Sequence, residues 1–247
     1  MKKIEEVSPD VAILMGPFLD LKNSAVTSSS ESFSTQWIKM VKTIAARVAE
    51  LSTKVLIGKC NGEVVSCPLY QCNGECCVPV TSSRDAVSYP VYPQPPFPGS
   101  DSYSANMKTI SDPAVLDIGG INVALTSTDI LFHLGKEEIS FPPRSGDRMS
   151  RLASHLLQQG SMYPLYPPSE DINLDLERVE QHALLEASPH LLLLPSDLAS
   201  FVREVGATTV LNPGRLTKGA GPGTYSLLKM RRGEGGGLET RAEIIRI

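Results

Sequence analysis

The stretch Leu211-Asn212-Pro213-Gly214-Arg215-Leu216-Thr217-Lys218-Gly219 is the starting point for assigning a fold. It follows a short apolar run, Thr208-Thr209-Val210-Leu211, with the composition of a buried strand. A second run of strand character, residues 224–230, comes after it. The loop between them therefore holds Asn212 and Arg215 at the end of a strand, where α/β proteins commonly carry functional residues.

The composition narrows the class of protein. A hydrophobic content of 41% in 247 residues can build a substantial core. The net charge of −4 does not favour nucleic acid as a partner of the whole chain. The sequence has no run of about 18 apolar residues, and its first residues lack the apolar centre of a signal peptide, so no membrane span is expected. Five cysteines, all between Cys60 and Cys77, do not form a disulfide framework spread along the chain, which favours an intracellular, reducing compartment.

Strands and helices alternate in the first half of the chain. Residues 11–15 form a continuous apolar run, typical of a buried parallel strand. Apolar residues recur at helical spacing over residues 35–51, and residues 53–57 have the character of the next strand, so we expect a parallel crossover. Residues 114–126 predict a tight hairpin that turns at Gly119-Gly120.

The second half of the chain predicts further helices and strands. Asp129 is placed to cap a short helix, and apolar spacing predicts a longer helix over residues 147–159. A buried strand is expected over residues 190–195. The pair Ser196-Asp197 is a helix-capping sequence, and it predicts a helix over residues 196–205. The element order fits an α/β fold with two sheets packed as a sandwich and helices outside.

Two segments depart from this pattern. Residues 58–77 are rich in cysteine, but the spacings C-x6-C, C-x4-C and C-x3-C do not match the paired C-x2-C knuckles of structural zinc sites. A surface insertion with free thiols is therefore favoured over a metal site. Residues 89–98 are rich in proline and must be extended. A linker or SH3-type ligand is one interpretation, and a fixed segment pinned by aromatic residues such as Tyr92 is preferred.

The loops that follow the predicted strands lack the usual residues of a hydrolytic metal site. Their candidate oxygen ligands are Asp20, Asn23, Asp85, Asp129 and Asn212. The four histidines lie in or beside helices, or just before a strand, where a packed or solvent-facing imidazole is expected. Neither the G-x-S-x-G nor the G-x-x-x-x-G-K-[ST] motif occurs. The residues by themselves therefore predict no catalytic centre.

Five motifs carry a resemblance to a known family. In chain order they are Gly16-Pro17-Phe18-Leu19-Asp20, Val91-Tyr92-Pro93-Gln94-Pro95-Pro96-Phe97-Pro98, Leu125-Thr126-Ser127-Thr128-Asp129-Ile130-Leu131-Phe132-His133-Leu134, Ser161-Met162-Tyr163-Pro164-Leu165-Tyr166-Pro167-Pro168 and Asn212-Pro213-Gly214-Arg215-Leu216-Thr217-Lys218-Gly219. In these motifs the chain resembles the C-terminal phosphoesterase-like domain of the B subunits of eukaryotic DNA polymerases. The Tyr-Pro-Leu-Tyr-Pro-Pro motif points to the alpha branch rather than to delta or epsilon. The resemblance covers nearly the whole chain outside residues 58–77.

The resemblance implies one domain over residues 1–247, with a calcineurin-like metallophosphoesterase sandwich flanked by helices but no activity. An active relative would carry Gly-Asp at Gly16-Pro17, Gly-Asn-His-Asp near Ser82-Ser83-Arg84-Asp85 and Gly-His-x-His at Asn212-Pro213-Gly214-Arg215. Replacing these ligands with Pro, Gly and Arg removes the donors of a two-metal site and adds a cation. We therefore expect no catalytic residue, metal or cofactor. The vestigial metal-site positions are Pro17, Asp20, Arg84, Asp85, Asn212 and Arg215.

The function implied by the resemblance is that of a non-catalytic scaffold in the nuclear DNA polymerase alpha–primase complex. Such a scaffold binds the C-terminal domain of the catalytic subunit, is linked indirectly to primase, and supports synthesis of RNA–DNA primers. Large aromatic and arginine side chains are the usual interface anchors, although buried tyrosines brace a fold as readily. The expected interface or structural anchors are Phe97, Tyr163, Tyr166 and Arg215.

Two alternatives to the scaffold are open from the sequence. The first is direct binding of primer or single-stranded DNA by the basic residues Arg215, Lys218, Lys229, Arg231 and Arg232. The second is a residual metal-dependent phosphoesterase that uses Asp20, Asp85, Asp129 and Asn212.

The chain departs from the family pattern in two places. Members begin with an oligonucleotide-binding (OB)-type domain, and their phosphoesterase-like part begins with a further strand. Neither is found in this sequence, so we expect a fragment that is incomplete at its N-terminus. The second departure is the cysteine-rich segment 58–77, which would interrupt one family strand between residues 53–55 and 78–80.

Overall fold

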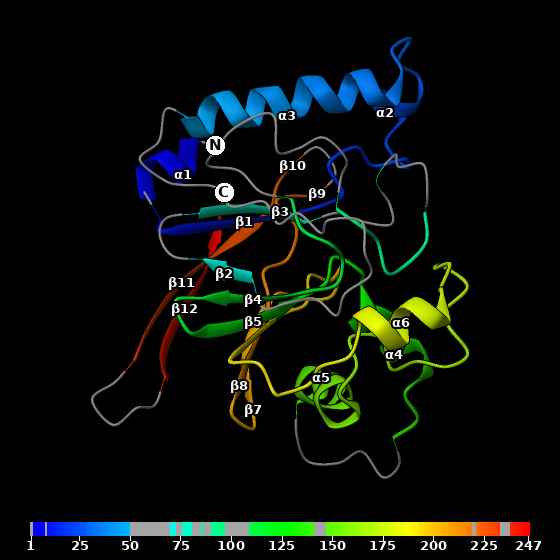
Figure 1. The fold of residues 1–247 in the computed structure, drawn as a ribbon, viewed down its shortest axis with the longest axis vertical. Helices are drawn as coiled ribbons and strands as arrows, with labels where there is room; N and C mark the ends of the chain where they lie inside the picture. The colour runs from blue at the N-terminus through cyan, green and yellow to red at the C-terminus, as the bar shows by residue number, and fades with distance from the viewer. Residues whose placement is uncertain are drawn as a thin grey trace.

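A computed structural model describes residues 2–7, 9–49, 70–72, 76–80, 85, 90–96, 109–140, 147–218, 221–232 and 238–247. Its centre is a six-stranded mixed sheet with the strand order β2-β4-β5-β6-β8-β7 (Figure 1). The strands are β2 (Tyr70–Cys72), β4 (Ala114–Ile118), β5 (Ile121–Leu125), β6 (Leu191–Leu193), β7 (Phe201–Val205) and β8 (Thr208–Asn212). β5, β6 and β8 are parallel neighbours, whereas β4–β5 and β7–β8 are antiparallel. The predicted α/β class is confirmed.

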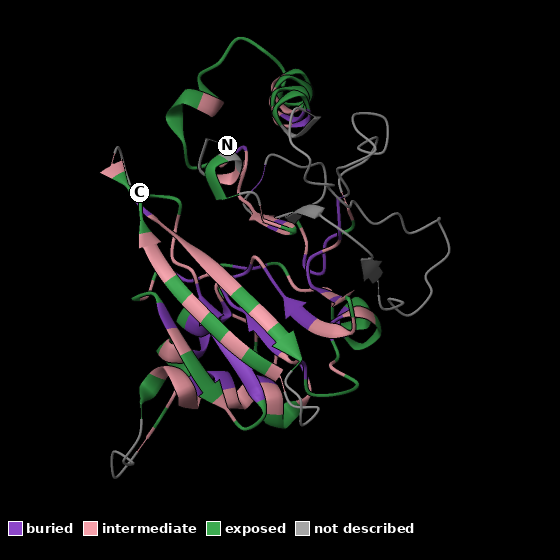
Figure 2. Ribbon diagram, turned by 90° about the vertical axis from the view of Figure 1, so that its left-hand side faces the viewer, coloured by how far each residue is buried: buried purple, intermediate pink, exposed green. Residues whose placement is uncertain are grey.

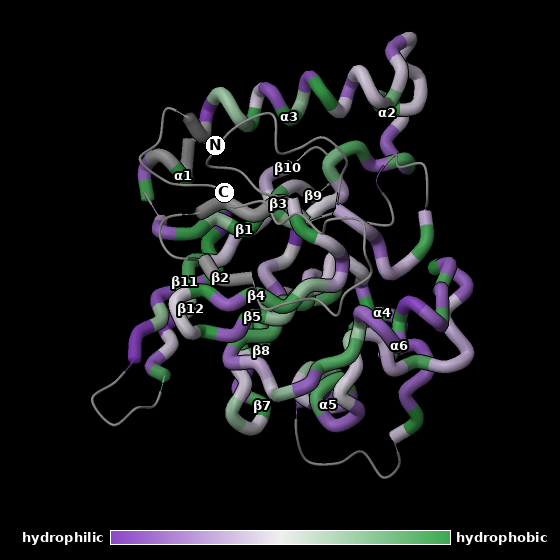
Figure 3. The backbone as a smooth tube through the Cα atoms, viewed as in Figure 1, coloured by the Kyte–Doolittle hydropathy of each residue, from purple (hydrophilic) through white to green (hydrophobic). Residues whose placement is uncertain are grey.

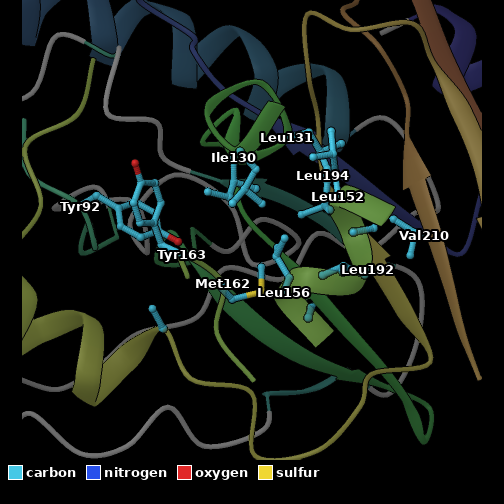
Figure 4. Close-up of a cluster of buried hydrophobic side chains, with 14 of the residues drawn as sticks. Tyr92, Ile130, Leu131, Leu152, Leu156, Met162, Tyr163, Leu192, Leu194 and Val210 are labelled. Atoms are coloured by element: carbon cyan, nitrogen blue, oxygen red, sulfur yellow. The ribbon is translucent and has the colours of Figure 1, made fainter. Parts of the chain in front are cut away.

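One face of this sheet, called the helical side, is covered by helices. The helices are α4 (Ile130–Glu137), α5 (Arg148–Gln159) and α6 (Leu176–His182). Because side chains alternate along a strand, Leu192 faces this side while its neighbours Leu191 and Leu193 face the other. Figure 4 shows Leu192 among the buried side chains of this cluster, with Leu156 of α5 close by.

The opposite face, called the strand side, is covered by further strands. β1 (Val11–Met15) pairs in parallel with β3 (Cys76–Val80). β11 (Thr224–Arg232) and β12 (Leu238–Arg246) form a long antiparallel pair, called the ribbon. Apolar residues of β1 and of the ribbon pack against the sheet. Residues along the ribbon are exposed or only partly buried (Figure 2).

The remaining described elements are peripheral. α3 (Phe33–Ala49) lies over β1 and buries Val41 and Ala45 against it. Hydrophilic and hydrophobic residues alternate along α3 in Figure 3, as expected for a helix with one packed face. The short elements are α1 (Lys2–Val7), α2 (Ser24–Thr27), β9 (Thr217–Lys218) and β10 (Gly221–Pro222). Within the described residues, every helix is either too short or too polar to span a lipid bilayer.

Several predicted elements are confirmed, together with their end signals. The side chain of Asp129 accepts the Phe132 N–H and caps α4. Asp147 caps α5 in the same way, and Gly160 ends that helix in the left-handed conformation at φ 59°. Residues 90–96 are fixed rather than a linker, because Tyr92 and Gln94 exchange backbone hydrogen bonds with two other segments.

The predicted helix over residues 196–205 is wrong. Phe201–Val205 forms strand β7, which pairs with β8 across a turn at Gly206, where φ is 63°. The apparent capping residue Ser196 makes a local turn instead, since its hydroxyl accepts the Leu198 N–H at 3.1 Å. A full-length partner strand therefore overrides the capping signal.

The predicted crossover and insertion are only partly visible. Residues 53–57 lie outside the described residues, and the described parallel partner of β1 is β3. Of the segment 58–77, Tyr70–Cys72 forms β2 at the edge of the large sheet, and Cys76 and Cys77 pair with β1. The rest of that segment lies outside the described residues.

Candidate functional site: the strand-end rim

Loops that follow β1, β5, β6 and β8, together with Asp85, form what we call the rim. Asp85 is 1% exposed. Its Oδ1 accepts the N–H groups of Phe18 and Leu19, at 2.5 and 2.7 Å, just after the cis peptide bond between Gly16 and Pro17. Asp20 forms an isolated bridge with Asp85 and accepts the Lys22 N–H at 2.9 Å. Both carboxylates therefore stabilise the conformation of the loop after β1.

Asn212 is fully buried at the end of β8. Its Oδ1 accepts N–H groups from Ser196 at 3.0 Å and from Gly214 at 2.9 Å. Its Nδ2 donates to the carbonyl oxygens of Leu198 and Ala199, both at 3.2 Å. The amide therefore joins the loop after β6 to the loop after β8 and has little capacity left for a ligand.

A second connection runs along the outside of the rim. Besides capping α4, Asp129 accepts the Asp197 N–H through Oδ2 at 2.7 Å. The Asp197 carboxylate in turn accepts from Arg215 Nη2 at 2.7 Å, and Arg215 Nε is also close to it. Asp129, Asp197 and Arg215 are thus linked to one another along the rim.

The loop after β8 approaches the start of the ribbon closely. Gly223 donates its N–H to Leu216 O at 3.0 Å, and Thr224 donates to Arg215 O at 2.8 Å. The Thr224 hydroxyl binds Pro213 O at 2.8 Å. A Cβ atom built on Gly223 would lie 1.9 Å from Arg215 O, so this crossing requires glycine.

Asp112 was not singled out by the sequence analysis, yet it lies fully buried at the rim. Ser127 donates its N–H to Asp112 Oδ1 at 2.9 Å and its hydroxyl to Oδ2. Burial raises the pKa of Asp112 to about 6, against the lowering effect of hydrogen bonds from Ser127 and Thr126. In sequence, Asp112-Pro113 is an ordinary turn signal, so only its contacts reveal its burial.

The two predicted tyrosine anchors have different surroundings. Tyr163 is 3% exposed, and its hydroxyl lies 3.2 Å from Nδ1 of the buried His133 and accepts the Ser169 N–H at 3.1 Å. Burial lowers the pKa of His133, which fits a packed neutral imidazole. Tyr166 is 76% exposed. The geometry therefore makes Tyr163 a brace and leaves Tyr166 free for contacts; Phe97 and Arg84 lie outside the described residues.

Among the side chains that the structure describes, the basic residues late in the chain do not gather into one unpaired patch. Arg215 binds Asp197, and Arg231 binds Glu239 across the ribbon. Arg232 donates to Gly120 O at 3.1 Å. Lys229 is exposed, and the side chain of Lys218 lies outside the described part of the chain. Among the described residues, no group of three or more His, Cys, Asp or Glu side chains is arranged to hold a metal ion.

Comparison with known proteins points to one family. The profile of the DNA polymerase alpha/epsilon B-subunit family matches residues 72–203, more than half of the chain. The chain belongs to this family. The matched part runs from β3 into β7 and includes helices α4, α5 and α6 and the loops with Asp112, Asp129 and Asp197.

Similar curated proteins are named as the B subunit of DNA polymerase alpha. The Rattus norvegicus protein is 38% identical over an alignment that covers 97% of this chain and 38% of the rat protein. The Mus musculus protein is 37% identical over 99% of this chain and 39% of its own length. The Schizosaccharomyces pombe protein is 29% identical over 96% of this chain and 42% of its own length. The chain thus spans about two fifths of the length of these B-subunit relatives.

Proposed function

We propose that this chain is the phosphoesterase-like body of a non-catalytic accessory subunit of DNA polymerase alpha. In this proposal residues 1–247 form one inactive domain with the metallophosphoesterase sandwich, and residues 58–77 are an insertion into it. The names of the relatives support the assignment to the polymerase alpha complex. The sandwich is supported by the packing of β1 and the ribbon on one face of the large sheet and of helices on the other.

The single observation that carries the non-catalytic interpretation is that the side-chain oxygens of the rim are bound to groups of the protein itself. Asn212, Asp85 and Asp129 all accept backbone N–H groups, and the cation of Arg215 is paired with Asp197. A two-metal phosphoesterase needs oxygen and imidazole ligands that are free to converge on the metals. The polar atoms of this rim instead hold its own loops together, which favours a structural role over a catalytic one.

The proposed role of this body is to hold the C-terminal domain of the polymerase catalytic subunit. It would thereby link the polymerase indirectly to primase and support RNA–DNA primer synthesis in the nucleus, with DNA contacted through the complex and no membrane involved. Exposed aromatic side chains are common interface anchors. Tyr166 is the anchor proposed on this ground, Phe97 is proposed from its motif alone, and Tyr163 braces the loop that carries Tyr166.

The decisive experiment has a binding arm and an activity arm. The chain is co-expressed with the C-terminal domain of the catalytic subunit and purified through a tag on that domain. Tyr166→Ala is expected to weaken co-purification by about tenfold or more, an order of magnitude typical of an anchor residue. Phe33→Ala changes another exposed aromatic residue, at the start of α3; it is the matched control and is expected to leave co-purification unchanged.

In the activity arm, the chain is incubated with manganese and a generic phosphodiester. No turnover above a buffer blank is expected. Hydrolysis that disappears in Asp20→Asn would contradict the proposal and favour the residual phosphoesterase instead. Equal loss of binding by both aromatic variants would reject Tyr166 as an anchor without touching the activity result.

A further inference from the structure

Residues 90–96, called the strap, run between two other segments of the chain. On one side, the Tyr92 N–H donates to Asn173 O at 2.8 Å and the Asp175 N–H donates to Tyr92 O at 2.9 Å. On the other side, Gln94 and Asp112 exchange backbone hydrogen bonds of 2.7 and 3.0 Å. Within the described residues, four backbone hydrogen bonds hold the strap, and two of them join it to Asp112, which carries a buried carboxyl group.

The carboxyl group of Asp112 is enclosed at this junction. It has no exposed surface and is bound by the N–H and hydroxyl of Ser127 and by the side chain of Thr126. Thr126 also lies 3.4 Å from the hydroxyl of Tyr92, which is itself fully buried in the strap. Among the described residues, the titratable groups that act on Asp112 are Asp85 and Tyr92, and neither is a cation.

An ionised carboxylate without a cation is costly to bury. Burial is the main reason that the pKa of Asp112 rises from 3.8 to about 6, and the charge of Asp85 adds to the rise. A group whose pKa is raised in the closed state stabilises that state fully below its ordinary pKa. This stabilisation is lost as the pH rises through about 6.

We propose that Asp112 and Ser127 form a proton-controlled lock on the strap. With the carboxyl group neutral, the junction of Gln94 with Asp112 stays closed. With the carboxyl group ionised, the junction opens more often, and the charge reaches water while the strap is open. The lock is independent of the proposed function, because it depends only on these contacts.

Opening of the strap would also affect the packing on the helical side of the sheet. The rings of Tyr92 and Tyr163 lie 5.8 Å apart and are neighbours in Figure 4. Tyr163 holds Ser169 and thereby fixes the loop that presents Tyr166. Ionisation of Asp112 would therefore loosen the exposed loop that carries Tyr166, because the effect passes through the packed rings of Tyr92 and Tyr163.

The test is amide hydrogen exchange of the 247-residue chain, corrected for the intrinsic pH dependence of exchange. Peptides containing Tyr92, Gln94 and Asp112 report on the junction, and a peptide within α5 reports on the rest of the fold. A carboxyl pKa of about 6 in the closed state and 3.8 in the open state gives an opening equilibrium about tenfold larger at about pH 7.5 than at about pH 5. The α5 peptide is expected to change much less.

Three variants make the result specific. Asp112→Asn is nearly isosteric and cannot ionise, so the pH dependence at the junction is expected to disappear. Ser127→Ala removes the hydroxyl that donates to the ionised carboxylate and leaves the backbone N–H in place, so the midpoint of the pH dependence is expected to rise. Asp117→Asn is the control, because Asp117 also accepts a backbone N–H in a turn but lies at the β4–β5 hairpin, and wild-type behaviour is expected.

Two results would overturn the lock. One is junction exchange that does not vary with pH in the wild-type chain. The other is a pH dependence that persists in Asp112→Asn while the α5 peptide shows the variant to be folded. An Asp112→Asn chain that does not fold leaves the midpoint shift of Ser127→Ala as the deciding measurement, and an unshifted midpoint then rejects the proposal.

Discussion

The residues that cover the two sides of the six-stranded sheet are buried to different degrees. On the helical side, Leu192 of the sheet and Leu156 of the covering helix are both fully buried. On the strand side, Leu125 of the sheet is fully buried, but the residues that cover this side, such as Ile13 and Ile244, are only partly buried. The same strands supply both faces, so the difference comes from what covers them.

This difference shows how one sheet can have a fully buried core on its helical side and a partly solvent-accessible layer on its strand side. A helix presents a wide apolar stripe and seals the residues beneath it. A two-stranded ribbon presents alternate residues only, and its other face and edges remain in water. We therefore expect the helical side to dominate stability and the strand side to tolerate change.

The largest expected effect tests this contrast directly. Leu192→Ala should lower the free energy of unfolding by about 2–5 kcal/mol, because it leaves a cavity among buried side chains. Ile244→Ala on the ribbon should cost about 1 kcal/mol, because that side chain is only partly buried and its truncation leaves no enclosed cavity. Urea unfolding followed by circular dichroism compares the two variants, and equal losses would remove the distinction between the sides.

The next effect concerns the rim, where the two sides meet. Asn212→Ala should cost about 2–4 kcal/mol, since it leaves buried N–H and carbonyl groups of two loops without partners. The matched control is Asn23→Ala, which removes an exposed cap of α2 and should cost about 0.5–1 kcal/mol. Thermal and urea unfolding of both variants would show whether the buried amide exceeds the exposed one.

A smaller effect separates the two tyrosines of one motif. Tyr163→Phe removes the hydroxyl shared by His133 and Ser169 and should cost about 1–2 kcal/mol. Tyr166→Phe should change the free energy of unfolding by less than about 0.5 kcal/mol, because Tyr166 is 76% exposed. If both variants unfold at the same urea concentration as the wild type, Tyr163 is not a brace.

An effect of known sign is expected from an ion pair on the helical side. The side-chain hydrogen bond from Arg151 is the main reason that the pKa of Glu138 is lowered. A lowered pKa gives stability that is present above about pH 4.5 and is lost as the pH falls further. Glu138→Gln should therefore destabilise the chain at neutral pH and approach the wild type in acid, as measured by urea unfolding across pH.

The smallest effect belongs to the corresponding pair on the ribbon. Arg231 and Glu239 form an ion pair, but their side chains are 80% and 58% exposed. Arg231→Ala should change the free energy of unfolding by less than about 0.5 kcal/mol, because water and salt screen exposed pairs. A loss as large as that of Glu138→Gln at neutral pH would show that the ribbon contributes more than its exposure indicates.

The sequence was sufficient for elements whose signal is local. The capping residue Asp129 placed α4, apolar spacing placed α5, and Gly119-Gly120 placed the β4–β5 hairpin. Strand β7 was misread because Ser196-Asp197 has a capping sequence while its structural role depends on distant partners. Pairing with β8, which no local pattern encodes, decided the outcome.

The candidate site was predictable in position but not in its contacts. Asp20, Asp85, Asn212 and Arg215 lie in the rim loops, as expected from where strands end. Their partners are mostly backbone groups of other loops, and these follow from the fold rather than from any motif. Asp112 was missed for the same reason, since its neighbour Ser127 lies 15 positions away in the sequence.

The close backbone contact at Gly223 couples the position of the loop after β8 to the position of the ribbon. Even a methyl group there would collide with the oxygen of Arg215, so any substitution must push the two backbones apart. A displaced ribbon would disturb Arg215 and, through its ion pair, the stretch around Asp197. A mutational scan of this region should therefore show near-complete intolerance at Gly223, whereas exposed positions nearby, such as Leu216 and Pro222, should accept many residues.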